Sequence, residues 1–171
     1  MFKLIENLVL WAAKASFFFG ALAMVFMMSH IGGDVFARTF FGSSLPGTLE
    51  VTAEWYMIAI VYMPLALVTL RNQHISVDLF THGLREKTQH WLRVMTSLAA
   101  LVFFYYWADA SLSLAFKKTK RLSYLDSGLL HIPTWPVYWA CFVAIVLLMA
   151  ATVIVLVRAV MAARKADETL Y

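Results

Sequence analysis

Four long apolar segments account for most of this 171-residue chain and constrain its fold more than any other feature. They run from Ala15 to Gly33, Val51 to Leu70, Val94 to Phe116 and Ile132 to Val157. A helix needs about 20 mostly apolar residues to cross a hydrocarbon core roughly 30 Å thick. Each segment is long enough to span. We therefore predict an all-α membrane protein with four transmembrane helices, at about 10–32, 50–71, 92–116 and 134–158.

Composition favours one membrane domain over several soluble ones. The chain is 62% hydrophobic and 14% charged, whereas an ordinary soluble domain has about 25% charged residues. No linker rich in Pro, Gly or Ser separates the segments, and what joins them is too short to fold into anything else, so we predict a single domain over residues 1–171. We expect spans without a Gly or Pro break, and a first segment retained as a helix rather than cleaved as a signal.

Cationic residues predict the orientation. Four spans place both termini on one side, and the termini together with the loop after the second span carry more Lys and Arg than the other two loops. An excess of cations marks the cytoplasmic side, so we expect both termini in the cytoplasm. A basic cluster at the end of the third segment would then face the other side; it consists of Lys117, Lys118, Lys120 and Arg121.

The loop after the second segment predicts a cytoplasmic amphipathic helix at about 77–91. Apolar residues such as Val77, Phe80, Leu84 and Trp91 recur at helical spacing, and cationic residues occupy the opposite face. Such a helix lies in the headgroup layer with its cations near anionic lipid, or packs on the cytoplasmic face of a partner.

Charged residues avoid the centres of the segments. An ionised residue at the bilayer centre costs about 3 kcal/mol or more, and Lys14, Glu54 and Asp109 all fall toward segment ends. Glu50 and Glu54, four residues apart, share one face of a regular helix. Without an acidic pair at mid-depth or a polar stripe along a helix, the sequence argues against a self-sufficient pump or channel.

The histidines and the cysteine predict no cofactor. His30 and His131 fall near the outer ends of the predicted helices, and His74 and His90 near the inner ends. Two such pairs at two membrane depths are what a dihaem bundle would need as axial ligands. These positions lie at or beyond the helix ends, where a haem would be exposed. No Cys or His pair has the spacing of zinc ligands, and Cys141 stands alone. We expect no metal, no cofactor and no enzymatic activity.

The junction between the first and second segments carries polar residues and a turn motif. Asp34 and Arg38 are four residues apart, so they can pair across one turn of a continued first helix. Pro46-Gly47 then forces a turn. Glu50 follows, where a carboxylate favours the positive N-terminal end of the second helix.

Two further junctions carry polar residues and prolines. Arg71, His74 and Asp78 follow the second segment. Pro133 and Trp135 begin the fourth, where proline is tolerated because the first helical turn has no intrahelical donor to lose. Any one of these junctions, taken alone, is explained as a cap, a turn or a surface ion pair.

Taken in this order, the junctions resemble the small, Q-type membrane subunit of a tripartite ATP-independent periplasmic (TRAP) transporter. The motifs are Asp34-Val35 with Arg38 and Phe41, Pro46-Gly47 with Glu50, Arg71 with His74-Ile75 and Val77-Asp78, and Leu130 and Ile132-Pro133 with Trp135-Pro136. The resemblance covers roughly Val9 to Val157, and the group after the second helix is its most specific part. Ala144 is a departure, because the family often has a glycine there.

The resemblance implies a scaffold in the bacterial cytoplasmic (inner) membrane. Its partners would be membrane lipid, a large sodium-coupled elevator subunit and, transiently, a periplasmic binding protein; no nucleic acid is expected. The transported substrate would be an organic acid of the C4-dicarboxylate or sialic acid class. The residues expected at the partner interface or in structural motifs are Asp34, Arg38, Glu50, Arg71, His74, Asp78, Pro133 and Trp135. Lys117, Lys118, Lys120 and Arg121 would help dock the binding protein, or contact lipid phosphate.

Two other classes stay open at this point. A small homodimeric four-helix exporter needs a membrane-buried carboxylate, usually in its first helix, and this first helix offers only Lys14. A haem-bearing membrane anchor of a respiratory enzyme needs the histidine pairs described above.

Overall fold

The computed structural model describes residues 2–71, 86–126 and 131–168, and most of them are helical. Four segments are long and apolar enough to cross a membrane. They are α1 (Phe2–Phe41), a second span from Thr48 to Leu70, α6 (Glu86–Lys120) and α7 (Trp135–Glu168). The prediction of four helices of spanning length is confirmed. The expected surface helix at 77–91 lies mostly outside the described residues, and its last part forms the first turns of α6.

The turn between α1 and the second span forms where its glycines and proline predict it. Gly42 follows α1 with a φ of 68°, the left-handed conformation that commonly ends helices. Gly47, with a φ of 82°, caps the short helix α2 (Thr48–Val51). Glycine adopts this conformation without a steric cost, so glycine is favoured at both positions.

The second span is interrupted twice, so the expectation of unbroken spans is wrong for this helix. After α2 comes a π-helical stretch, η1 (Thr52–Tyr56), which continues into α3 (Met57–Tyr62). A turn at Met63 and Pro64 then separates α3 from α4 (Leu65–Leu70). Proline lacks the N–H that would bond to the carbonyl four residues earlier, and its ring clashes with that turn.

Helix α1 compensates for the break at Pro64. The Leu67 N–H donates to the Pro64 carbonyl, which leaves the Met63 carbonyl outside the helical ladder. Ser16 of α1 donates its hydroxyl to that Met63 carbonyl at 2.9 Å. One turn later, a Cβ added at Gly20 would lie 3.3 Å from atoms of Met63 and Pro64, so a side chain there would push these neighbours back by a few tenths of an ångström.

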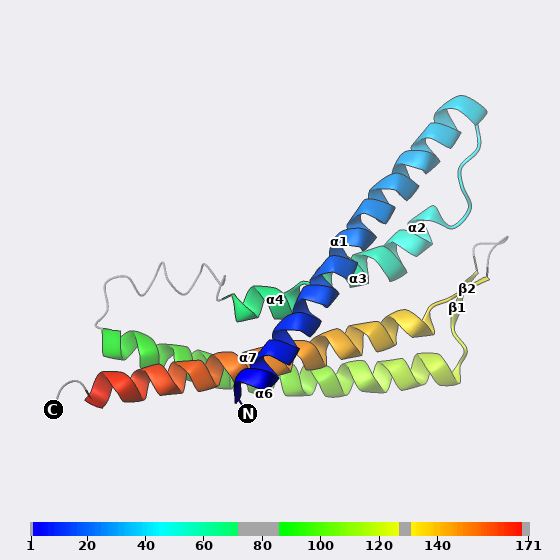
Figure 1. The fold of residues 1–171 in the computed structure, drawn as a ribbon. Helices are drawn as coiled ribbons and strands as arrows, with labels where there is room; N and C mark the ends of the chain where they lie inside the picture. Colours follow the sequence, from blue (N-terminus) through cyan, green and yellow to red (C-terminus); the bar gives the residue numbers. More distant parts are fainter. Residues whose placement is uncertain (1, 72–85, 127–130, 169–171) are drawn as a thin grey trace.

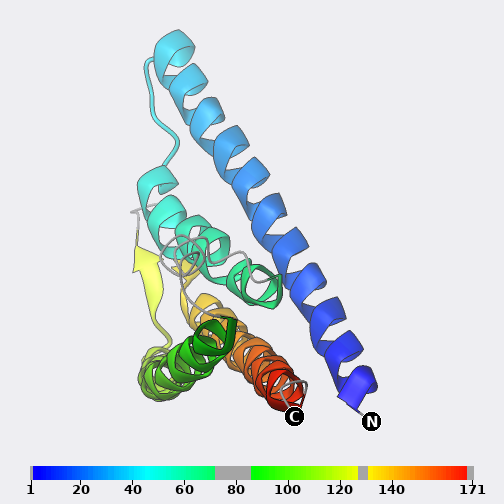
Figure 2. The same ribbon diagram turned by 90° about the vertical axis from the view of Figure 1, so that its left-hand side faces the viewer.

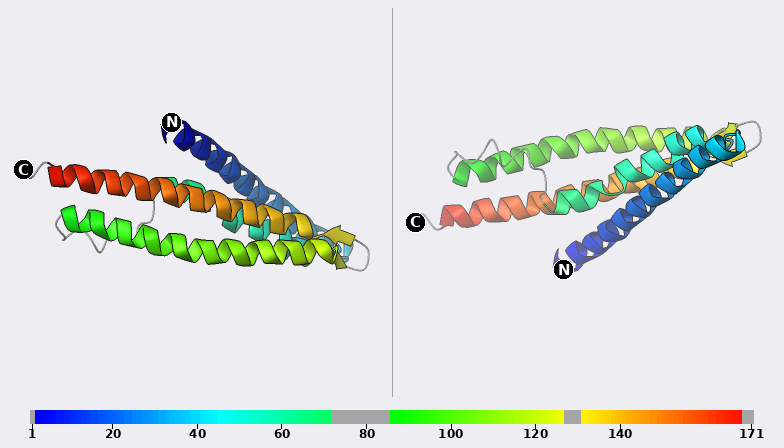
Figure 3. Two further views of the ribbon diagram at one scale, coloured as in Figure 1. Left: turned by 90° about the horizontal axis from the view of Figure 1, so that it is seen from below. Right: turned by 90° about the horizontal axis from the view of Figure 1, so that it is seen from above.

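The helices form a pair with two further elements laid against it. α6 and α7 run antiparallel and side by side, and the second span packs on α7 (Figures 1 and 3). α1 slants across the second span and α7, and its last turns extend past the start of α2 (Figures 1 and 2). In Figure 1 the α1–α2 turn and the start of α7 lie on the same side of the molecule, with the turn well apart from α7, and the ends of α4 and α7 point to the opposite side.

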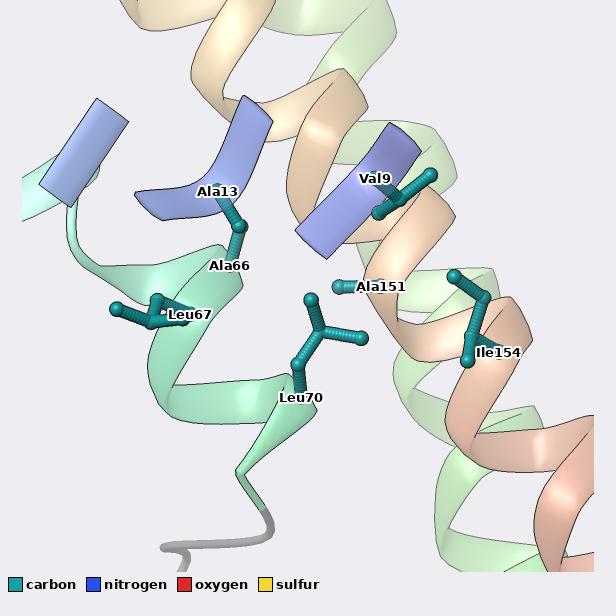
Figure 4. Packing of buried hydrophobic residues seen from close by; sticks show 7 residues of the cluster. All are labelled: Val9, Ala13, Ala66, Leu67, Leu70, Ala151 and Ile154. Atoms are coloured by element: carbon teal, nitrogen blue, oxygen red, sulfur yellow. The ribbon is translucent and has the colours of Figure 1, made fainter. Parts of the chain in front are cut away.

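A buried cluster holds α1, α4 and α7 together (Figure 4). Its members are Val9, Ala13, Ala66, Leu67, Leu70, Ala151 and Ile154. Three of the seven are alanines, and small residues let helix backbones approach closely in a membrane, where packing rather than the hydrophobic effect drives association.

A β-hairpin joins α6 to α7, which corrects the expectation that the connections are too short to fold. Strands β1 (Tyr124–Asp126) and β2 (His131–Pro133) pair antiparallel. Leu122, at a φ of 44°, ends α6, and the Ser123 N–H returns to the Lys118 carbonyl at 3.0 Å, as in a Schellman motif. Thr134 closes the base by donating its N–H and its hydroxyl to the Ser123 carbonyl, at 2.9 and 3.0 Å.

Candidate partner interface

Asp34 fastens the end of α1 to the turn that follows it. Its Oδ2 accepts a bond from Arg38 Nη2 at 2.8 Å, so the expected pair across one helical turn forms. Its Oδ1 accepts the Leu45 N–H at 2.7 Å, a contact that spacing alone does not reveal. Asp34 is 5% exposed, whereas the Arg38 side chain is 62% exposed. The carboxylate therefore serves the fold, and the guanidinium faces outward.

The two glutamates of the second span have different surroundings. Glu50 lies exposed in the first turn of α2, at the positive end of the helix as predicted. Glu54 lies in η1 and is half-buried, and its Oε2 accepts the Tyr138 hydroxyl of α7 at 2.8 Å. A π-helical turn holds more residues than an α-helical one, so the regular four-residue spacing does not carry through this stretch.

Further side-chain contacts join the last turns of α6 to the first turns of α7. Lys118 Nζ lies 4.8 Å from the centroid of the Tyr138 ring, a cation–π arrangement. One residue on, Trp139 Nε1 donates to Thr119 Oγ1 at 2.9 Å. These pairings cannot be read from the sequence, because no local spacing connects α6 with α7.

The basic cluster is not uniform. Lys117, Lys120 and Arg121 are exposed, whereas Lys118 is half-buried against Tyr138. Lys117, Lys118 and Lys120 all lie in the last turn of α6, where cations balance the partial negative charge of a helix C-terminus. This structural role is independent of any partner.

Pro133 and Trp135 lie where the polypeptide passes from the hairpin into α7. Pro133 is exposed and pairs with Tyr124 in the hairpin. Trp135 is the first residue of α7 and is 38% exposed. Thr134, buried between them, makes the two bonds to Ser123 that fix this junction.

At the opposite end of the molecule, the structure describes one of the three predicted motif residues. Arg71 is exposed, and its N–H closes the last turn of α4 on the Leu67 carbonyl. His74 and Asp78 lie outside the described residues. An unpredicted ion pair between Glu6 of α1 and Arg158 of α7 joins the start of the first helix to the end of the last.

Two of the histidines, His30 and His131, have aromatic neighbours. His30 Nδ1 lies 3.5 Å from the Tyr56 hydroxyl, which links α1 to η1. His131 lies beside the ring of Tyr124 across the hairpin. Within residues 2–71, 86–126 and 131–168, no three His, Cys, Asp or Glu side chains are placed to hold a metal ion.

Large apolar side chains cover the outward faces of α1 and α6. On α1 they include Leu8, Trp11, Phe18, Phe26, Phe36 and Phe40, and on α6 Met95, Val102, Phe103, Tyr105 and Tyr106. In the most apolar stretch of each helix, 11% of the residues are buried in α1 and 6% in α6. These faces are therefore available to lipid or to another membrane protein.

Comparison with family models decides the class. Residues 27–162 match the DctQ component of the tripartite ATP-independent periplasmic transporters. The chain belongs to this family. Comparisons with curated proteins and with solved structures found no match.

Membership in the DctQ family confirms the resemblance drawn from the junction motifs. The chain is a small membrane subunit of a TRAP transporter and a multi-pass membrane protein, and its family is a transporter component rather than an enzyme. The family implies two partners, a large membrane subunit and a periplasmic binding protein. The haem-anchor and exporter alternatives are thereby set aside. Ala144, where a glycine was expected from the resemblance, is only 5% exposed, so α7 packs closely with a methyl group there.

Proposed function

We propose that this DctQ subunit is a stationary scaffold for the large subunit of a sodium-coupled elevator transporter. The outward apolar faces of α1 and α6 carry the proposal, because they offer packing surface while the described charges lie toward the helix ends. A subunit that moved ions or substrate itself would need polar groups along a path through the membrane.

Reconstitution tests the scaffold role. The large subunit is purified with and without this chain and placed in liposomes with the binding protein and an inward sodium gradient. We expect sodium-dependent uptake only with the chain present, and co-purification of the two membrane subunits. Full uptake by the large subunit alone would contradict the proposal.

The substrate class follows from the resemblance and is an organic acid, either a C4-dicarboxylate or a sialic acid. Specificity would belong to the binding protein and the large subunit, so this chain needs no substrate site. In the same liposomes, uptake of labelled succinate or of a labelled sialic acid separates the two classes. Uptake of neither would exclude both.

We place the chain in the bacterial cytoplasmic membrane with both termini in the cytoplasm. The Lys and Arg bias supports this orientation, and the Glu6–Arg158 pair is consistent with termini on one side. A reporter that is active only in the periplasm, fused after Met161 or within the hairpin, tests it. We expect activity from the hairpin fusion alone; the reverse pattern would invert the topology.

Arg71, His74 and Asp78 would fix the turn into a cytoplasmic amphipathic helix at about 77–91, or contact the large subunit directly. His74 and Asp78 enter through the resemblance alone. Replacing Arg71 and Asp78 together by alanine should lower the yield of the two-subunit complex. Lys3→Ala with Asp109→Ala removes the same charges from exposed positions elsewhere and should not. Equal yields from both double variants would remove this role.

The basic cluster would help dock the binding protein by electrostatic steering. Lys117, Lys120 and Arg121 are the exposed members, so reversing these three charges to glutamate is the direct test. We expect the charge reversal to slow uptake, and to slow it more at low salt than at high salt, because salt screens exposed charges. Loss that does not depend on salt would argue against steering, and Lys3→Glu is the matched control.

A further inference from the structure

A cleft of about 300 Å³ opens between the second span and α7. Its walls include Trp55, Ala59 and Tyr62 on one side and Pro136, Ala140 and Cys141 on the other, and its lining is almost entirely apolar. The volume lies at the lower end of the range for small-molecule sites, about 300–1,000 Å³. The cleft is thus large enough to hold a ligand.

The cleft has a defined direction relative to the membrane. Pro136 is the second residue of α7, at the end of the helix that carries the hairpin, and Cys141 lies more than a turn deeper. On the second span, Trp55 lies near the same end as Pro136, and Tyr62 lies deeper, as Cys141 does. The cleft therefore begins at a helix end and runs toward the middle of the span.

A cation in the last turn of α6, Lys118, lies outside the cleft lining but contacts a residue next to it. Tyr138 lies in α7 between the cleft-lining Val137 and Ala140, and Lys118 Nζ lies 4.8 Å from the centroid of its ring. Lys117 and Lys120 lie in the same last turn of α6, and Arg121 comes directly after the helix. The nearby carboxylate of Glu54 already accepts the Tyr138 hydroxyl. These cations outnumber the Glu54 carboxylate, so the outer end carries a net positive charge, whereas the cleft itself is apolar.

We propose that an anionic phospholipid binds here, with one acyl chain in the cleft and its phosphate near Lys118. Its polarity runs in the same direction as that of the site, with a charged headgroup at the membrane surface and hydrocarbon toward the centre. A whole helix of a partner, about 10–12 Å across with its side chains, would not fit a cleft of this size. A free phosphate would leave the apolar part empty. The proposal holds independently of the scaffold role.

Native mass spectrometry of the full chain in detergent tests lipid binding directly. The protein is titrated with dioleoyl-phosphatidylglycerol and, separately, with the zwitterionic dioleoyl-phosphatidylcholine. We expect one molecule of the anionic lipid to stay bound at concentrations where the zwitterionic lipid is lost. Equal retention of the two lipids, or retention of neither, would overturn the proposal.

Variants test the contributions of the cleft and of the cation separately. Ala140→Leu and Ala59→Leu fill the cleft from opposite walls and should weaken binding of both lipids, whereas Ala110→Leu, on an exposed face of α6, should not. Using two walls keeps the test decisive if one variant folds poorly. Binding that survives both cleft-filling changes would show that the chain lies elsewhere.

Lys118→Gln should weaken phosphatidylglycerol binding about fivefold, the effect expected for one cation near an anionic lipid, and leave phosphatidylcholine binding unchanged. Lys3→Gln removes the same charge from an exposed position outside the site and should have no effect. Equal binding by the two variants would show that Lys118 does not contact the lipid. Displacement of the lipid by soluble glycerol 3-phosphate would identify a phosphate site without the cleft and so contradict the proposal.

Discussion

Helices α7 and α1 are both long and apolar, yet they are held in the molecule in different ways. In their most apolar stretches, 33% of the residues of α7 are buried and 11% of those of α1. α7 contacts α6, α4, α3 and α1, and it buries side chains such as Ile145 and Leu148 along its length. α1 is attached along a narrow stripe that includes Val9, Ala13, Ser16 and Gly20.

This difference shows that hydrophobicity does not decide burial inside a membrane. Lipid chains are as apolar as leucine, so an apolar face gains little by turning inward, and close packing and hydrogen bonds select the helix partners. Four changes, from the largest expected effect to the smallest, test whether α7 carries the bundle while α1 is only fastened to it.

Ile145→Ala should have the largest effect. Ile145 is fully buried in α7, and truncating a buried isoleucine leaves a cavity that costs about 2–5 kcal/mol. Thermal or denaturant unfolding of the protein in detergent measures the loss. Val146→Ala is the matched control because Val146 is 44% exposed. A similar loss from both variants would mean that α7 is not the packing centre.

Gly20→Leu should detach α1 while α6 and α7 stay paired. A side chain at this position meets Met63 and Pro64 at 3.3 Å, and overpacking of this kind costs about 1–3 kcal/mol. Cross-linking between cysteines placed at Ala13 and Ala66, both in the shared core, should fall. Gly32→Leu is the control, since nothing lies within 4 Å of a Cβ there. Unchanged cross-linking in Gly20→Leu would show that α1 is held elsewhere.

Asp34→Ala should loosen only the end of α1. It leaves the Leu45 N–H without its acceptor, at a cost of about 1 kcal/mol. Hydrogen exchange at the Leu45 amide should become faster, with little change in global stability. Arg38→Ala keeps the bond to Leu45 and removes an arginine whose side chain is 62% exposed, so its effect should be smaller. An equal effect would indicate that the ion pair, rather than the Leu45 bond, secures the turn.

The Glu6–Arg158 pair should contribute least. The side chains are 25% and 41% exposed, and ion pairs in such surroundings are typically worth about 0.2–1 kcal/mol. A double-mutant cycle with Glu6→Gln and Arg158→Gln measures the coupling, which should shrink as salt is raised. Coupling above this range would mean that charge contributes substantially to holding α1 against α7.

The features predicted correctly from the sequence depend on local spacing. The lengths of the apolar segments fix four spans, and a separation of four residues puts Asp34 and Arg38 on one side of a turn. Pro64 was a visible signal of a break, but it lies in a segment whose overall hydropathy reads as one continuous span. The Ser16 hydroxyl lowers the cost of this break, and that contact crosses between two helices.

Contacts between distant residues leave no local pattern. Tyr138 and Glu54 are 84 residues apart, and Arg158 and Glu6 are 152 apart. The sequence therefore left Glu54 without a role, and the cleft beside it depends on how η1 and α3 pack against α7. The hairpin was missed because its strands have three residues each, too few for an alternating pattern to be recognised.

The bond from Ser16 to the Met63 carbonyl also bears on how the chain is assembled during synthesis. A helix broken at Pro64 carries an unsatisfied carbonyl into hydrocarbon, where each such group costs several kcal/mol. Because α1 precedes the second span in the chain, the hydroxyl that satisfies this carbonyl is made first. The second span can enter the bilayer beside a helix that already offers the missing donor, so insertion and pairing of these two helices become a single event.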